Sequence, residues 1–165
     1  MAGGGTDFSD GIPATSAELH DPRAVAVDHA GNLVISNSIF DPRIRVVAAA
    51  TGTFYGQDSG NGIPATDAHL PRPAGVAVDG VGNLLIAALH DSRIRVVAAA
   101  TGTFYGQAMT AGDIYTVAGG GKGRVENGGP ATGARLLRPE GVAAGPAGSI
   151  VIADTDNGLI RTVTG

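Results

Sequence analysis

The sequence predicts an all-β fold built from three tandem repeats, and three observations support this prediction. Of its 165 residues, 27 are glycine and 9 are proline, which suits many short strands joined by tight turns. Hydrophobic residues make up 43% of the chain but aromatic residues only 4%, so Val, Ile, Leu and Ala must form the core. The third observation is a stretch, RIRVVAAATGTFYGQ, that occurs at 43–57 and again, unchanged, at 93–107. An identity of this length indicates duplication or deliberate copying, and repetition is typical of stacked structural units.

The repeated stretch belongs to a longer pattern that occurs three times. Its copies begin at Gly11, Gly62 and Gly128, each with a proline two residues later. We therefore expect a single repeat domain over residues 1–165. Its three units are repeat 1 at about 11–57, repeat 2 at about 62–119 and repeat 3 at about 128–165.

Each repeat contains three predicted strands in the same order. In repeat 1 a Gly-Asn turn at 30–32 separates the first two strands and indicates a hairpin. A fourth strand is clear only at 113–117, and residues 53–55 are the candidate for its place after repeat 1. Residues 14–19 and their equivalents favour helix but are short, so we expect single turns between the repeats. The predicted strands are 25–28, 33–35 and 44–47, then 76–79, 84–86 and 94–97, then 142–144, 150–152 and 160–163.

The repeat pattern, GxPATxAxLxxPxGVAVDxxGNLxIADxxNxRIRxV, resembles the NHL repeat of β-propeller proteins. The resemblance implies that the chain forms three propeller blades. It implies little about function, because the family includes protein-binding scaffolds, sensor domains and a few enzymes. Repeat 3 departs from the pattern, since Gly145 stands where the other repeats have Asp28 and Asp79. The residues that carry the resemblance are 73–79, 82–84, 93–95 and 153–157.

Three blades form an open wedge with two apolar end faces, whereas a closed propeller usually has about four to eight blades. Two copies of the chain supply six, and a two-fold dimer is the commonest oligomer. We therefore expect a homodimer that closes as a six-bladed ring. Residues 2–5 parallel residues 118–121, so the opening segment matches the tail of a fourth strand, and each junction could be completed across chains. The alternative is that the chain is a truncated piece of a longer protein.

Candidate ligand-binding residues lie in the loops that meet at the channel mouth of propellers. His and carboxylate side chains bind metals when they converge. Six-bladed relatives that act as lactonases or lyases hold a metal near the channel with acidic residues from such loops. The same residue types also form turns, and no position carries His or a carboxylate in all three repeats, so the sequence favours the structural reading. The candidate residues are His20, Arg23, Arg72, His90, Arg138, Glu140, Asp154 and Asp156.

Arginines recur on the third predicted strand of each repeat, where they alternate with apolar residues. This alternation predicts that they lie on a polar strand face and pair with nearby carboxylates such as Asp28 or Asp79. A ring of anion-binding guanidinium groups is the less favoured alternative. These arginines are Arg43, Arg45, Arg93, Arg95 and Arg161.

Charge and composition narrow the possible functions. A net charge of −4 with a pI near 5.4 and no basic block argues against nucleic-acid binding. The chain has no cysteine, which excludes disulfides and thiolate metal sites. We expect no membrane partner, since neither a signal peptide nor a run of about 18 apolar residues is visible. The compartment stays undetermined, and the Ala, Gly, Val and Arg bias suits a bacterial source.

Three functional hypotheses follow. We expect a non-catalytic scaffold that assembles as a ring and binds a protein or peptide, with no cofactor and no catalytic residue. The first alternative is a metal-dependent, lactonase-like hydrolase or lyase with Ca²⁺ or Zn²⁺ at the axial channel. The second is an engineered or recently amplified propeller fragment whose main property is self-assembly, as the repeated identical stretch indicates.

Overall fold

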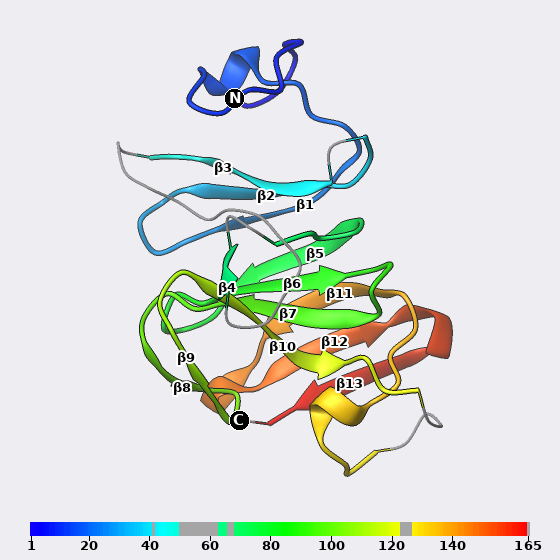
Figure 1. Cartoon of the computed structure of the whole chain (residues 1–165). Helices are drawn as coiled ribbons and strands as arrows, with labels where there is room; N and C mark the ends of the chain where they lie inside the picture. The colour runs from blue at the N-terminus through cyan, green and yellow to red at the C-terminus, as the bar shows by residue number, and fades with distance from the viewer. Residues whose placement is uncertain (41, 50–62, 66–67, 123–126, 165) are drawn as a thin grey trace.

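A computed structural model describes residues 1–165 except 41, 50–62, 66–67, 123–126 and 165. It is all-β, and three antiparallel sheets follow one another along the chain as propeller-like blades (Figure 1). Blade 1 consists of β1 (Pro22–Val27), β2 (Leu33–Asn37) and β3 (Arg43–Val47). Blade 2 consists of β5 (Pro73–Val78), β6 (Leu84–Ala88), β7 (Arg93–Val97) and β10 (Asp113–Gly119). Blade 3 consists of β11 (Pro139–Ala144), β12 (Ile150–Asp154) and β13 (Leu159–Val163).

Shorter elements lie at the edges and in the connections. Strand β4 (Ile63–Pro64) pairs with the outer edge of β10, and β8 (Gly102–Phe104) and β9 (Gln107–Met109) form a hairpin between β7 and β10. The 3-10 turns are η1 (Ala14–Ser16), η3 (Ala131–Gly133), η4 (Pro146–Gly148) and η5 (Thr155–Asn157).

The predicted strands are confirmed, and most begin one to three residues earlier than the sequence indicated. The single turns expected near residues 14 and 131 are also confirmed. The candidate strand at 53–55 lies outside the described residues. In repeat 2 the identical residues Thr103–Phe104 belong to β8 rather than to the fourth strand. Within the described part of the chain, no helix is long and apolar enough to cross a membrane.

The aspartate and asparagine of the repeat pattern build the turn between the first two strands. In blade 1 the Asp28 carboxylate accepts hydrogen bonds from the Asn32 backbone N–H at 2.9 Å and from the Asn32 side-chain amide at 2.7 Å. Asn32 Oδ1 in turn accepts the N–H of Ala49 at 2.8 Å, which ties the end of the third strand to the turn. Equivalent bonds in blade 2 join Asp79, Asn83 and Ala99. In blade 3, where Gly145 replaces the aspartate, the short turn η4 closes the hairpin instead.

The core lies between the blades, where the facing sides of neighbouring sheets bury their apolar residues against each other. Strand β6 shows this most clearly, since all five of its residues are buried. Leu84 and Ile86 pack toward blade 1 with Val34, whereas Leu85 packs toward blade 3 with Ile150. A strand buried on both faces must be apolar throughout, which is why LLIAA lacks the alternation of an exposed strand.

The innermost strands run side by side, with β5 in contact with both β1 and β11. At Gly75 the approach is so close that a Cβ would stand 2.7 Å from the Glu140 carbonyl oxygen and 2.9 Å from the Val142 nitrogen. Glycine at this position therefore lets blades 2 and 3 meet near the axis.

Candidate functional site

Each blade presents the same pair of loops at one edge: the loop that enters its first strand and the loop that follows its second strand. In each blade a backbone N–H of the second loop donates to a carbonyl of the first. In the entering loops Asp21, Arg72 and Arg138 adopt left-handed φ values of 49°, 52° and 47°, each immediately before the proline that begins a strand. Because this unusual conformation recurs in all three blades, it belongs to the repeat fold. The loop-to-loop bonds are Ser38 to His20 at 3.2 Å, His90 to Pro71 at 3.3 Å and Asp156 to Leu137 at 3.1 Å.

Asp154 is the one candidate residue that is fully buried. Its Oδ1 accepts the backbone N–H of Leu137 at 2.7 Å, and its Oδ2 accepts the side-chain amide of Asn157 at 2.8 Å. Arg161 Nη1 lies 3.5 Å from Oδ2. Since both oxygens are engaged within blade 3, the geometry supports a structural role for Asp154 in joining the two loops.

The equivalent positions in the other blades follow the same logic. Asn37 ends β2 opposite Pro22, and its Oδ1 accepts the N–H of His20 at 2.6 Å. Ala88 ends β6 opposite Pro73, and Pro71, which stands where His20 stands in blade 1, has no N–H to donate. An acceptor side chain thus ends the second strand in blades 1 and 3, where the entering loop has an N–H to donate, but not in blade 2, where proline replaces that N–H. Our sequence reasoning missed this relationship, although the acceptor and the loop residue can both be read in the repeats.

The exposed charges of blade 3 form a small cluster around Arg138. Its guanidinium lies 3.7 Å from the Glu140 carboxylate and 3.6 Å from the Asp156 carboxylate. All three side chains are exposed to solvent, so these ion pairs contribute little to stability.

The blade 1 mouth residues form an aromatic cluster instead. The His20 ring stacks on Phe8 with a centroid distance of 5.1 Å, and Phe40 meets it edge-on at the same distance. His20 Nε2 also lies 3.0 Å from a Glu18 carboxylate oxygen. Arg23 lies apart from this cluster, paired with Asp21 at 2.8 Å.

In blade 2 the loops bring Arg72 and His90 near each other through the backbone. The Leu89 N–H donates to the Arg72 carbonyl at 3.3 Å, next to the bond between His90 and Pro71. The Arg72 Nε is buried and has no hydrogen-bond partner among the described residues, whereas the His90 side chain is exposed. The candidate residues of each blade thus lie near one another. Within the described ranges, no three His, Asp or Glu side chains converge as a metal site would require.

The strand arginines pair with carboxylates other than the expected Asp28 and Asp79, whose oxygens serve the hairpin turns. Arg43 and Arg45 lie 3.6 and 3.9 Å from Asp10, Arg93 lies 3.3 Å from Asp91, and Arg161 pairs with Asp154. Arg95 is buried rather than on an exposed polar face, and this burial lowers the pKa of its guanidinium. The physical reason is that the carboxylate oxygens of Asp28 and Asp79 already accept hydrogen bonds within the hairpin turns.

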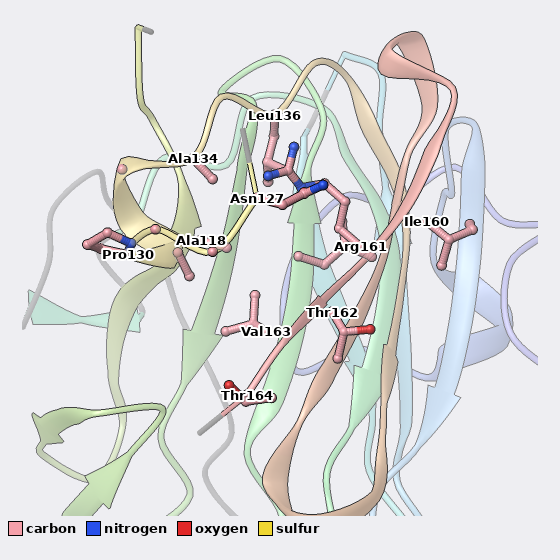
Figure 2. Close-up of a pocket in the computed structure, with 15 residues that line it drawn as sticks. Ala118, Asn127, Pro130, Ala134, Leu136, Ile160, Arg161, Thr162, Val163 and Thr164 are labelled. Carbon is pink, nitrogen blue, oxygen red and sulfur yellow. The ribbon is translucent and has the colours of Figure 1, made fainter. Parts of the chain in front are cut away.

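A cavity of about 860 Å³ lies between the connection that contains η3 and the outer edge of blade 3. Figure 2 shows Pro130, Ala134 and Ala118 on one side of it, facing Arg161, Thr162 and Val163 of β13. No sequence motif pointed directly to this cavity. The indirect signal was that a fourth strand is clear in repeat 2 but not in repeat 3, whose third strand borders the cavity.

A comparison with protein families decides the type of repeat. The family model described as NHL repeat matches residues 136–162. Residues 136–162 are thus similar to an NHL repeat. This segment spans the three strands of blade 3, and the predicted resemblance is confirmed there.

No curated protein sequence matches the chain. Among solved structures, an auxiliary nutrient binding protein from Bacteroides thetaiotaomicron matches with a TM-score of 0.51 and 17% identity, over 92% of this chain and 38% of that protein. A protein from Thermus thermophilus, described as a putative oxidoreductase (glucose dehydrogenase), matches with a TM-score of 0.40 and 18% identity, over 98% of this chain and 50% of that one. This chain therefore spans half or less of either protein. The first likeness supports the propeller-like fold and nothing finer.

Proposed function

We propose that the chain is a non-catalytic propeller scaffold, and that two copies close into a six-bladed ring that presents its mouth loops to a protein or peptide. Blades 1 and 3 are the outermost blades of this chain (Figure 1). Each has one face that contacts blade 2 and one end face that points away from it. In the ring, the end face of blade 3 packs on the end face of blade 1 from the second copy.

A comparison of equivalent valines on β1 and β5 carries this proposal. Val76 of β5 faces blade 1 and is 8% exposed, whereas Val25, at the same position of β1, is 62% exposed. Val27 of β1 is also largely exposed. Val76 is buried and its blade 3 equivalent Val142 is half-buried, and both have a preceding blade. The much greater exposure of Val25 therefore marks a surface suited to another blade.

The far end of the chain shows the complementary feature. Ile160 of β13 is among the most exposed large hydrophobic residues, and Val151 and Ala153 of β12 lie on the same strand face. This face corresponds to the side of blade 2 that packs on blade 3. A second copy offers the matching partner for each end, so that both junctions of the ring repeat the contacts already made inside the chain.

The mouth loops supply the binding surface in this proposal. Phe40 is 86% exposed beside the half-exposed ring of His20, and the charged cluster around Arg138 occupies the equivalent edge of blade 3. Aromatic groups and exposed charges of both signs suit a peptide with apolar and charged side chains.

The ring is tested with two matched substitutions. Val25 and Val81 are 62% and 61% exposed, but Val81 lies in the turn between β5 and β6, away from the end faces. We expect the unsubstituted chain and Val81→Asp to sediment as dimers and Val25→Asp as a monomer with an unchanged circular dichroism spectrum. Equal sedimentation of all three forms would contradict the ring.

The binding surface is tested separately with a random peptide library displayed on phage. We expect selected peptides to bind the unsubstituted chain and to lose binding to Phe40→Ser, whereas Val81→Ser keeps it. Peptides that bind both variants equally would place the binding surface elsewhere.

A further inference from the structure

The outer edge of blade 3 differs from the outer edge of blade 2. In blade 2 the third strand β7 pairs with the fourth strand β10 from Ile114 to Gly119. Strand β13, the equivalent third strand of blade 3, pairs with β12 and with no other strand of the described chain. The cavity of about 860 Å³ runs along this edge, with Ile160–Thr164 forming one of its walls.

The N-terminal segment has the backbone of the end of a fourth strand. Gly3 and Gly4 adopt φ values of 85° and 94°, and Gly119 and Gly120 adopt 86° and 91°. Gly5 donates its N–H to the Ala17 carbonyl at 3.2 Å, just as Gly121 donates to that of Ala134 at 3.1 Å.

The packing of the two glycine segments agrees as well. A Cβ on Gly3 would stand 3.1 Å from Leu19 Cδ1, and a Cβ on Gly119 would stand 3.0 Å from Leu136 Cδ1. Leu19 and Leu136 are equivalent residues of the repeat, so residues 1–5 lie against blade 1 as residues 117–121 lie against blade 3.

The N-terminal segment and residues 117–121 differ in the atoms that lie next to Gly3 and Gly119. The Cβ position of Gly119 lies 2.2 Å from the carbonyl oxygen of Ser92, immediately before β7, whereas at Gly3 the nearest atoms, out to 3.9 Å, all belong to the Leu19 side chain. Met1, which corresponds to the buried Val117, is fully exposed. The N-terminal segment thus has the form of a fourth-strand end without a third strand, and β13 is a third strand without a fourth in the described chain.

We propose that residues 1–3 of one copy add to the edge of β13 in a second copy. The register is that of β10 on β7, in which Ala118 lies opposite Ile94 and Gly119 opposite Arg93. Ala2 then lies opposite Ile160 and Gly3 opposite Leu159, at the edge of β13 along which the cavity runs. Figure 1 shows the N-terminal segment beyond blade 1 and β13 at the other end of the chain, so the pairing joins two copies. Adding a strand to an open sheet edge provides main-chain hydrogen bonds that packing of the end faces alone does not.

This inference rests on the proposed ring, and a disulfide test separates the two. The chain has no cysteine, so cross-links can form only at introduced positions. Ala2→Cys and Ile160→Cys are made as separate variants, mixed as dissociated chains, reassembled and oxidised. We expect a covalent dimer from the mixture and none from either variant alone, because in a two-fold ring the two copies of one position lie at different junctions.

The register is checked with Thr162→Cys in place of Ile160→Cys. Thr162 is exposed on the same face of β13, two residues along the strand, and its equivalent Val96 lies opposite Tyr115 rather than Ala118. We expect its cross-link with Ala2→Cys to be about tenfold less abundant. Equal cross-linking of both pairs would overturn the proposed register.

Hydrogen exchange on the unsubstituted chain gives an independent measurement. Amides of residues 2–5 and of β13 should exchange at least about tenfold more slowly in the dimer than in the monomeric Val25→Asp variant. A dimer without the cross-link and without this protection would overturn strand addition and leave the ring intact. A chain that stays monomeric would overturn both.

Discussion

Ile94 and Ile160 occupy the same position on the third strands of two successive blades, yet Ile94 is 0% exposed and Ile160 is 73% exposed. Ile94 packs in the junction with blade 3, together with Leu136 and Ile152. Ile160 faces the side on which the described chain places no further blade. The contact that Ile94 makes between blades 2 and 3 therefore has no counterpart at Ile160 within the described chain.

Replacing Asp154 by alanine should destabilise blade 3 strongly. The change leaves the Leu137 N–H without its acceptor and the Arg161 guanidinium without the Asp154 carboxylate, in a place where Asp154 itself is fully buried. Breaking a buried pair of this kind typically costs about 3–5 kcal/mol. Urea unfolding measures the change in the free energy of unfolding.

Asp156→Ala is the matched control, because Asp156 pairs with Arg138 at the exposed end of the same loop. We expect its effect to stay below about 1 kcal/mol. Equal effects of the two alanine substitutions would refute the structural role of Asp154.

Replacing Gly75 by alanine should loosen the junction between blades 2 and 3. The new Cβ would stand 2.7 Å from the Glu140 carbonyl oxygen, so β5 and β11 must separate, at a typical cost of about 1–3 kcal/mol. Gly80→Ala is the control, since no atom lies within 4 Å of its Cβ position. Thermal unfolding should show a lower midpoint for Gly75→Ala only, and an unchanged midpoint would mean that the inner strands yield easily.

The hairpin β8–β9 should become sensitive to alkaline pH through Tyr105. Its hydroxyl donates to the Asp79 carboxylate at 2.5 Å, and burial together with this carboxylate raises the pKa of Tyr105 far above its usual value. Because the pKa in the folded state lies above that in the unfolded chain, this stabilisation is complete below about pH 10 and is lost as the pH rises toward the folded-state pKa.

Tyr105→Phe removes this dependence. We expect the variant to be less stable by about 1–2 kcal/mol near neutral pH, and the difference from the unsubstituted chain to shrink above about pH 10. Chemical unfolding at several pH values measures it. A constant difference across the alkaline range would show that the Tyr105 hydroxyl titrates normally.

Strand positions could be predicted from the sequence because the repeats align short apolar runs with turn residues. The hairpin of Asp28 and Asn32 shows why: an Asp and a Gly-Asn pair at fixed spacing specify a local turn that needs no distant partner. The single turns near residues 14 and 131 were equally local.

The pairing of side chains between distant segments could not be predicted in the same way. Arg161 lies beside Asp154 and not beside a turn aspartate, because the strand face that carries it was unknown until the blades were placed. The same limit applies to Tyr105, which reaches Asp79 only because the β8–β9 hairpin folds back over blade 2. Candidate residues of the three blades could be named from their loops, but their grouping within blades required the structure.

The molar mass of the unsubstituted chain in solution, measured by light scattering after size exclusion, tests the ring most directly. The chain has a mass of 16.3 kDa, and we predict twice this mass, independent of concentration over the range in which the ring is stable. A single species at 16.3 kDa would contradict closure by two copies and would leave the exposed faces of Val25 and Ile160 without the partner proposed for them.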